Sequence, residues 1–310
     1  MMFGLRERFD YFMCGACASL QIVTIPPDLG RFYPESYYSF QSPARRRGLR
    51  QWLRRTRDRY AVSSTGWLGR WLYARHPYPE LRSLANVPSL HRGARVVDVG
   101  CGAGLLLRSL HELGFRALTG IEPYLRHEVA LPDGVRIERG TLSDVNGEWD
   151  LIMFHHSFEH VPNPAGVLAD AASRMTGGAC ILIRVPVVPS FSFDRYGEDW
   201  VGWDAPRHLF IPSVRGMERL AAAAGLRVTL VRYDSTELQF WGSEQYRRDI
   251  PLFAERSVAV NPRGSEFTRE ELRTFRRRAN ELNNMREGDQ AAFYLVRSTA
   301  ASGRVTGGTA

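Results

Sequence analysis

The sequence of 310 residues predicts an α/β protein built on a doubly wound sheet of seven strands. From Arg95 onward, short apolar runs alternate with helical patterns, which is typical of a parallel sheet covered by helices on both faces. The first run leads directly into a glycine-rich turn and then into a helix. One large domain with extensions therefore accounts for the chain.

The expected strands are short and rich in valine, isoleucine and leucine. They cover residues 95–99, 117–121, 135–138, 150–154, 179–185, 227–233 and 291–296. The first connecting helix covers 103–113 and is closed by Gly114. The second covers 165–175 and ends at Gly177-Gly178, and the third starts at the N-cap Ser213 and stops at Gly225.

Extensions and an insertion surround this alternating pattern. Their predicted ranges are a leader at 1–44, a basic and aromatic helical linker at 45–90, the main domain at 91–298, an insertion at 234–290 before the last strand, and a disordered tail at 299–310. The insertion contains an arginine-rich helix at 268–286. A connection of this length is usually functional, so we expect it on the acceptor side of a binding site.

Composition excludes several classes of protein. Lys plus Arg is 41 against 33 for Asp plus Glu, a net charge of +8, and no lysine occurs, which excludes Schiff-base chemistry and a P-loop. No apolar run reaches the ~18–20 residues of a membrane span, and no signal peptide opens the chain. The 4 cysteines are too few for a disulfide framework. A cytoplasmic protein is therefore expected.

The strongest chemical signal is the glycine turn after the first strand. Gly100, Gly102 and Gly104 have the spacing GxGxG, and such a turn lets the backbone approach a ligand closely. The NAD fingerprint GxGxxG would need a third glycine where Leu105 stands. Glu122 follows at the end of the second strand, ~20 residues on, where an acid accepts hydrogen bonds from ribose hydroxyls. An adenosine-bearing ligand is predicted.

Successive segments resemble the motifs of class I S-adenosylmethionine-dependent methyltransferases. These segments are residues 96–104, 120–123, 140–144 and 158–164. The resemblance implies a Rossmann-like methyltransferase sheet and S-adenosyl-L-methionine (SAM) as the cofactor. It also implies that the three glycines surround the methionine part, that Asp98 lies near its amino group, that Glu122 holds the ribose, and that Leu142 and Asp144 lie by the adenine. Cys101, Pro123 and His155 complete the implied cofactor contacts.

The resemblance extends to the branch known as methyltransferase domain 23. Residues 31–40, 205–210 and 288–295 are similar to signatures of that branch. The branch is mostly bacterial and often linked to the modification of sugars and surface glycans, which implies a small-molecule or saccharide acceptor.

Many relatives in this branch hold a structural zinc with two Cys-x-x-Cys pairs. Here Cys14 and Cys17 form one pair and no second pair exists, although a tetrahedral site needs four ligands. Either the site has decayed or the true start lies upstream of Met1. No metal is predicted.

A methylated hydroxyl must lose its proton, and histidine is a suitable base. The candidates are His156 and His160, just beyond the fourth strand, and His208 on a later segment. Our hypothesis is that His156 or His208 is the base; alternatively, each of the three has a structural role. In the related ubiquinone-pathway O-methyltransferases this motif has acids that can ligate a divalent metal, and His156 stands in place of one of them, which argues against a magnesium site.

Two further features leave alternatives open. Trp200, Trp203, Asp204 and Arg207 could wall an acceptor pocket with the insertion, or be core or dimer surface. The stretch Arg45 to Arg59 is a solvated helix face, a contact with the anionic inner face of a membrane, or a nucleic-acid contact. The last is disfavoured, because residues 155–158 do not match the signature of amino-group DNA methyltransferases.

The predicted function is a SAM-dependent methyltransferase acting on a small-molecule or sugar acceptor. The alternatives are a catalytically inactive SAM-binding scaffold of a glycan-assembly complex, and an RNA methyltransferase. The sequence does not indicate an oligomeric state.

Overall fold

The computed structural model describes residues 2, 4–33, 48–88, 90–125 and 135–298. Parts of three predicted features lie outside the described residues: the tail 299–310, the leader signature from residue 34 onward, and the first arginines of the basic stretch.

The predicted seven-stranded sheet is confirmed. Its strands are β3 (Val96–Val99), β4 (Leu118–Ile121), β5 (Val135–Glu138), β6 (Trp149–His155), β7 (Met175–Pro186), β9 (Leu226–Tyr233) and β10 (Gln290–Arg297). They lie in the order β5-β4-β3-β6-β7-β10-β9. The first five strands pair in parallel, and β10 pairs antiparallel with both β7 and β9.

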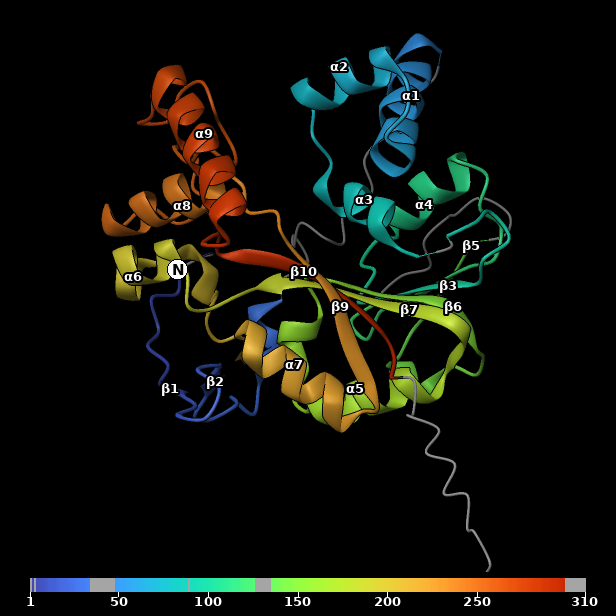
Figure 1. Ribbon diagram of the computed structural model, residues 1–310. Coiled ribbons are helices and arrows are strands. Elements are labelled where there is room, and N and C mark those ends of the chain that lie inside the picture. Colours follow the sequence, from blue (N-terminus) through green and yellow to red (C-terminus); the bar gives the residue numbers. More distant parts are fainter. Residues whose placement is uncertain (1, 3, 34–47, 89, 126–134, 299–310) are drawn as a thin grey trace, which may run out of the picture.

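Helices cover both faces of this sheet (Figure 1). The helices are α1 (Leu49–Ser63), α2 (Trp67–Arg75), α3 (Pro79–Ser83), α4 (Leu105–Glu112), α5 (Pro164–Ser173), α6 (Phe191–Tyr196), α7 (Val214–Ala223), α8 (Leu238–Arg247) and α9 (Arg269–Met285). Side chains of α5 and α7 pack in one core, and side chains of α1, α3 and α4 pack in the other. Within the described ranges, no helix is both long and apolar enough to cross a bilayer.

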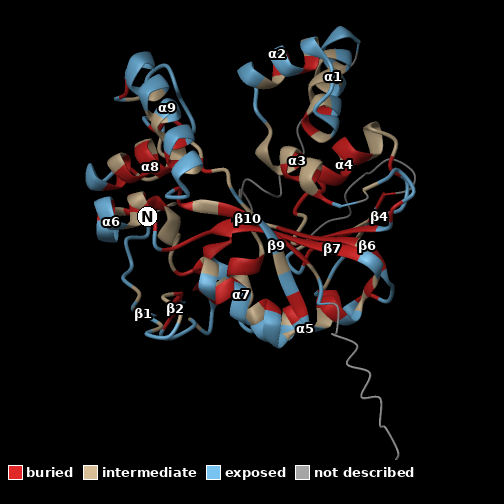
Figure 2. Cartoon of the chain, viewed as in Figure 1, coloured by how far each residue is buried: buried red, intermediate tan, exposed pale blue. Residues whose placement is uncertain are grey.

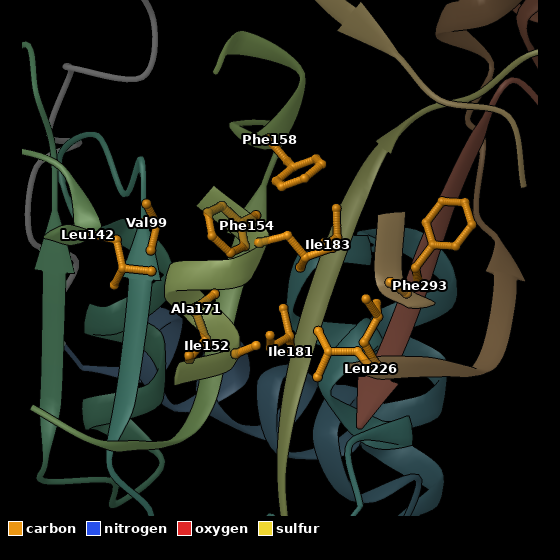
Figure 3. Close-up of a cluster of buried hydrophobic side chains, with 14 of the residues drawn as sticks. Val99, Leu142, Ile152, Phe154, Phe158, Ala171, Ile181, Ile183, Leu226 and Phe293 are labelled. Carbon is orange, nitrogen blue, oxygen red and sulfur yellow. The ribbon is translucent and has the colours of Figure 1, made fainter. Parts of the chain in front are cut away.

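Alternation along the central strands explains this two-sided burial. Ile152 and Phe154 of β6 lie in the α5–α7 core, whereas Leu151 and Met153 lie in the α4 core. In β7, Ile181 and Ile183 face the first core in the same way (Figure 3). The sheet is buried along most of its length, while α2 and α9 expose much of their surface (Figure 2). A strand with apolar side chains on both faces is stable only between two helical layers.

Two expected boundaries are wrong. The second helix ends at Ser173, and β7 begins at Met175, so Gly177-Gly178 lie inside the strand. The register of β6 and β7 shifts between Trp149 and Leu151, as at a β-bulge, which accounts for glycines within a strand. The first helix begins at Leu105 because Gly102 and Gly104 have left-handed backbone angles. The N-cap Ser213 is confirmed, since its side chain accepts from the Gly216 amide.

A second, three-stranded sheet is absent from the sequence prediction. It consists of β1 (Tyr11–Met13), β2 (Leu20–Ile22) and β8 (Phe210–Ile211), in that order. It ties the leader to the segment that contains His208, and the Tyr11 hydroxyl donates to the His208 carbonyl oxygen at 2.7 Å. The leader therefore forms part of the surroundings of the predicted site.

The aromatic residues around the insertion form a core of their own. Trp200 and Phe240 are buried together with residues of α9, and the Trp200 indole donates to Asp289 at 3.0 Å. Of the two roles left open for Trp200, the core role is the one the structure supports. Trp203 is half-buried and packs against Tyr11 with ring centroids 4.9 Å apart.

Candidate active site

The loops that follow the parallel strands meet at one edge of the sheet. The chain passes from β3 to β4 on one side and later to β6 on the other, so the strand order reverses at β3. In such sheets a ligand binds in the crevice beyond the carboxyl ends of the strands at this point. Gly100, Glu122 and His156 each follow one of the three strands involved.

The glycine turn is shaped for close approach. Gly100, Gly102 and Gly104 have φ angles of +78°, +53° and +70°, a backbone region that residues with a side chain rarely adopt. A Cβ atom at Gly100 would lie 2.4 Å from the Cβ of Ser157, on the loop after β6. Only glycine allows the two loops to come this close.

Glu122 faces this turn from the neighbouring strand. Its carboxylate is buried and accepts hydrogen bonds from the amides of Gly102 at 2.9 Å and Tyr124 at 3.1 Å. Burial raises the pKa of Glu122. Pro123, which follows, is exposed.

Asp98 is a second buried carboxyl group, at the base of the same turn. Burial, with the nearby charge of Glu122, raises its pKa to about 7. Its Oδ1 has no hydrogen-bond partner among the described residues. A buried carboxylate that has an unpartnered oxygen and lies beside a second carboxyl group is stabilised by a bound cation. The turn and the two acids thus fit a ligand with adenosine hydroxyls and positive charge, as SAM has.

The structure also places the remaining residues that the resemblance implies as cofactor contacts. The carboxylate of Asp144 accepts from the Thr141 amide at 2.7 Å within a capping box, and Leu142 is buried in the α5–α7 core. Burial raises the pKa of the Cys101 thiol. Both ring nitrogens of His155 lack a partner among the described residues, and burial, followed by the charge of Arg184, lowers its pKa to about 3, so the ring is neutral.

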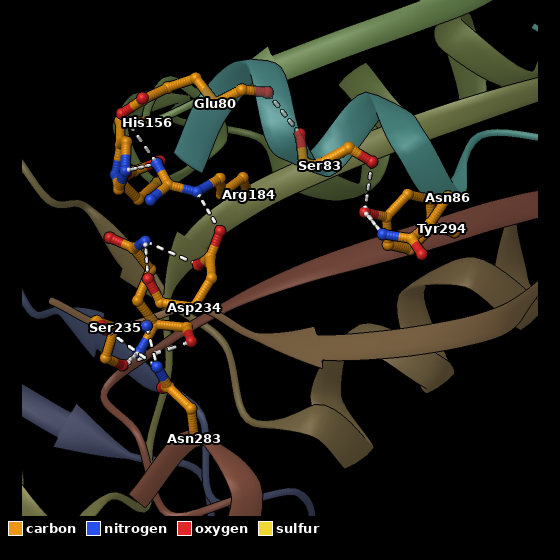
Figure 4. Close-up of polar contacts among 11 residues, drawn as sticks. Glu80, Ser83, Asn86, His156, Arg184, Asp234, Ser235, Asn283 and Tyr294 are labelled. Carbon is orange, nitrogen blue, oxygen red and sulfur yellow. Dashed lines mark hydrogen bonds and ion pairs between the residues drawn. The ribbon is translucent and has the colours of Figure 1, made fainter. Parts of the chain in front are cut away.

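His156 is held from two sides. Its Nε2 lies 2.5 Å from the guanidinium of Arg184 (Figure 4). Its Nδ1 lies 3.4 Å from Oε1 of Glu159. Because arginine can only donate, Nε2 must be the acceptor. The backbone of His156 has a φ of +54°, a strained conformation of the kind found at functional sites.

Arg184 is a site residue that the sequence patterns do not predict. Its side chain is 2% exposed and contacts Asp234 at 2.6 Å and Glu80 at 3.3 Å in addition to His156. The one available signal was an arginine within the apolar strand Ile181–Val185, where a buried charge needs partners. It links β6, β7, β9 and α3 at the site edge.

Glu159, His160 and His208 converge beside this network. Glu159 and His160 lie on the turn after β6, and the Leu209 amide donates to the Glu159 carbonyl oxygen at 2.8 Å, which brings His208 close. The His160 and His208 rings are 4.9 Å apart between centroids. Burial lowers the pKa of His208 to about 4. Tyr33 of the leader stacks on Tyr124 and lies at the edge of His160.

Cys14 and Cys17 lie in the turn between β1 and β2. Backbone amides of Ala16 and Cys17 hydrogen-bond to the Cys14 thiol and lower its pKa. In the described part of the chain no third potential ligand joins the pair, so the knuckle remains half of a zinc site there.

The fold, the glycine turn and the two acids fit a SAM-dependent methyltransferase, and the match to a family model shows that the chain is one. The chain belongs to the Methyltransf_23 family, described as a methyltransferase domain, whose model matches residues 69–231.

Curated relatives and a solved structure are similar to this chain. The ubiquinone biosynthesis O-methyltransferase of Methylocella silvestris is 33% identical over 166 residues, which are 48% of this chain and 62% of that protein. That of Bordetella bronchiseptica is 32% identical over 157 residues, 45% of this chain and 65% of that protein. The chain thus spans less than two thirds of these relatives. A complex of the Haloferax volcanii Trm112 methyltransferase activator with a methyltransferase has a TM-score of 0.48 and 17% identity, covering 78% of this chain and 98% of that chain.

Proposed function

We propose that this protein transfers the methyl group of SAM to a hydroxyl oxygen of a small-molecule acceptor. The family match and the relatives named for O-methylation support this proposal. The observation on which it depends most is the pair of buried carboxyl groups, Asp98 and Glu122, beside the glycine turn. In the proposal Gly100, Gly102 and Gly104 surround the methionine part, and Glu122 accepts hydrogen bonds from ribose hydroxyls while it keeps its amide partners.

The acceptor hydroxyl reacts at the histidine side of the site. Its oxygen bonds to the methyl carbon as the carbon–sulfur bond breaks, the electron pair stays on sulfur, and S-adenosylhomocysteine is the product. The proton passes to a histidine. His156 is poorly suited to receive it, because Arg184 already occupies its Nε2. His160 is the better base, since its Nδ1 contacts the Arg207 carbonyl oxygen and the proton-free Nε2 remains. His208 has the same arrangement at the Gly202 carbonyl oxygen, but burial lowers its pKa to about 4, which makes it a weaker proton acceptor.

A saccharide is the alternative acceptor that we propose for the same site. It loses the support of Trp200, because this residue is buried in the insertion core together with Phe240. The support that remains for a saccharide acceptor comes from half-buried aromatic residues such as Trp203. A small phenol, by contrast, is the acceptor class that the O-methyltransferase relatives make the first to test.

The decisive experiment combines binding with turnover. We expect calorimetry to detect SAM and S-adenosylhomocysteine but no nicotinamide coenzyme, and labelled SAM to pass its methyl group to one member of a panel of phenols, nucleotide sugars and lipid-linked glycans. Heat with a nicotinamide coenzyme and none with SAM would overturn the proposal. Binding without transfer to any acceptor would instead favour the scaffold alternative.

Binding of SAM is expected to depend on the ionisation of Asp98. Since the pKa of Asp98 is about 7, its anionic form increases as the pH rises from 6 to 7.5, and the cation should bind about fivefold to tenfold more tightly. Calorimetric titrations across this range measure the change. The Asp98→Asn variant should show a flat profile, and an unchanged slope in that variant would exclude Asp98 as the cause.

The ligand-free protein should respond to pH in the opposite sense. The folded-state pKa of Asp98 lies above the ordinary value of 3.8, so the stability that its protonation provides is complete below about pH 4 and is lost as the pH rises to about 7. Thermal unfolding of wild type and Asp98→Asn tests this difference.

We also propose that α1 and α2 contact an anionic membrane surface. Leu49, Trp52, Trp67 and Trp71 are 70%, 53%, 81% and 49% exposed. Exposed arginines stand among them, including Arg50, Arg59 and Arg70. Other arginines of this stretch are used internally, because Arg54 and Arg55 pair with Glu112 of α4. Exposed aromatic residues with arginine suit a headgroup layer, where each arginine contributes about 1 kcal/mol.

Vesicle sedimentation tests this contact. Phosphatidylglycerol vesicles should bind the protein and phosphatidylcholine vesicles should not, and Trp67→Ser with Trp71→Ser should reduce binding about tenfold or more. Met285→Ser, at an exposed site on α9, is the matched control. Equal binding by both vesicle types would contradict the contact, and tight, salt-sensitive binding of RNA would favour the nucleic-acid alternative.

A further inference from the structure

The cluster of Glu159, His160 and His208 places three electron-pair donors around one point. One potential ligand atom from each residue lies within 4.8 Å of the other two. Glu159 is fully buried; its Oε2 has no hydrogen-bond partner in the described part of the chain, and its Oε1 lies 3.4 Å from Nδ1 of His156. Nε2 of His208 lies 3.7 Å from Oε1 of Glu159. A buried carboxylate with only one long contact of this kind is costly unless a positive charge compensates it.

The hydrogen bonds of the two rings fix where their protons lie. Nδ1 of His160 is 2.8 Å from the Arg207 carbonyl oxygen, and Nδ1 of His208 is 2.8 Å from the Gly202 carbonyl oxygen. A carbonyl oxygen only accepts, so each Nδ1 bears a hydrogen, and each neutral ring keeps a lone pair on Nε2. The lone pair on Nε2 of His208 therefore lies 3.7 Å from the Glu159 carboxylate with no hydrogen between them, and the His160 ring lies beside both. A cation stabilises this arrangement.

The surroundings resemble those that orient metal ligands in proteins. Histidines that bind metal usually donate their second N–H to a carbonyl or carboxylate, as both rings do here. His156 lies between Arg184 and the Glu159 carboxylate, and it restricts the position of that carboxylate. A second carboxylate oxygen, Oδ2 of Asp204, lies 3.7 Å from Nε2 of His208 and adds negative charge.

We propose that Glu159, His160 and His208 bind one divalent transition-metal ion, with Zn²⁺ as the first candidate. Two imidazoles and one carboxylate suit zinc and its first-row neighbours, whereas magnesium prefers oxygen ligands. Three protein ligands leave a coordination position open. This inference replaces the sequence expectation of no metal, and the ligand His208 comes from outside the motif after β6.

The catalytic role of this ion rests on the proposed function, methyl transfer to a hydroxyl oxygen. A divalent ion at this point acts as a Lewis acid toward an acceptor oxygen and lowers the pKa of its hydroxyl. The ion also occupies the lone pairs that would otherwise take the proton. His160 and His208 can therefore act either as metal ligands or as the base, but not as both at once. A chelator distinguishes the two roles.

Cobalt is the direct probe of this site, because Co²⁺ replaces zinc and its visible absorption reports imidazole ligation. The full chain, freed of metal with a chelator, should bind one equivalent of Co²⁺, and Zn²⁺ should displace it. Glu159→Gln and His208→Gln should each weaken Co²⁺ binding about 100-fold or more. His76→Gln, at an exposed histidine, is the control and should bind as wild type does.

Three measurements keep the result interpretable. Circular dichroism shows that each variant is folded, and if His208→Gln does not fold, the wild-type titration and Glu159→Gln decide. Calorimetry with SAM is run on the metal-free chain, so that loss of the cofactor site is recognised separately. A folded wild type without a cobalt spectrum, or with a spectrum that Glu159→Gln leaves unchanged, would overturn the metal site while leaving the proposed methyl transfer intact.

Discussion

Replacing Glu122 by glutamine is expected to weaken SAM binding by about 100-fold, or ~2.7 kcal/mol. The carboxylate is buried at the turn and accepts from two backbone amides, so it is already fixed in position. A carboxylate accepts two ribose hydroxyl hydrogen bonds at once, whereas an amide offers one acceptor and turns a donor toward the second hydroxyl. The loss therefore combines a missing charged hydrogen bond with an unfavourable contact. Isothermal titration with SAM and S-adenosylhomocysteine measures it.

The matched control for this variant is Glu138→Gln. Glu138 ends the neighbouring strand β5 but is exposed, so its substitution should change the affinity less than twofold. The unfolding temperature of both variants must be recorded, because Glu122 also holds the amide of Gly102. An unchanged affinity in a folded Glu122→Gln protein would show that the ribose does not bind at this acid, and the assignment of the cofactor site would fail.

The sheet and the cofactor side of the site are the parts that the sequence predicts well. Both depend on local patterns: alternating burial in β6 and β7, and a glycine turn whose φ angles only glycine adopts easily. Glu122 could be predicted because parallel neighbouring strands place their ends at one edge. None of these inferences needs a contact between distant segments of unknown arrangement.

The acceptor side depends on distant contacts, and there the sequence is a weaker guide. Strand β8 has two residues, and its pairing with β2 depends on a leader almost two hundred positions earlier. Without that pairing, nothing in the sequence brings His208 to Glu159. His156 lies toward Arg184 and His160 toward Tyr33, and neither contact is indicated by the position of these histidines after the fourth strand. Sequence periodicity therefore does not predict which buried polar side chains become partners.

Replacing Arg184 by methionine is expected to lower the free energy of unfolding by about 3 kcal/mol at pH 7. The guanidinium is 2% exposed and is the shared partner of Asp234, Glu80 and His156. Methionine has a similar volume and no charge, so packing is largely kept while two carboxylates lose their counter-charge. Urea unfolding of both proteins gives the difference. Turnover should fall as well, because His156 is no longer held.

The pH dependence separates this electrostatic effect from a packing defect. Burial raises the pKa of Glu80, but Arg184 outweighs it and holds this pKa below the ordinary value of 4.5. Wild type thus gains stability from Glu80 above that pH and loses it as the pH falls. In the variant Glu80 has no such gain, so the stability difference between the two proteins should shrink between pH 7 and pH 4. Arg232→Met, at an exposed site on β9, should change stability by less than about 0.5 kcal/mol. Arg184→Lys should recover part of the loss, and a difference that stays constant with pH would show that Arg184 acts through packing alone.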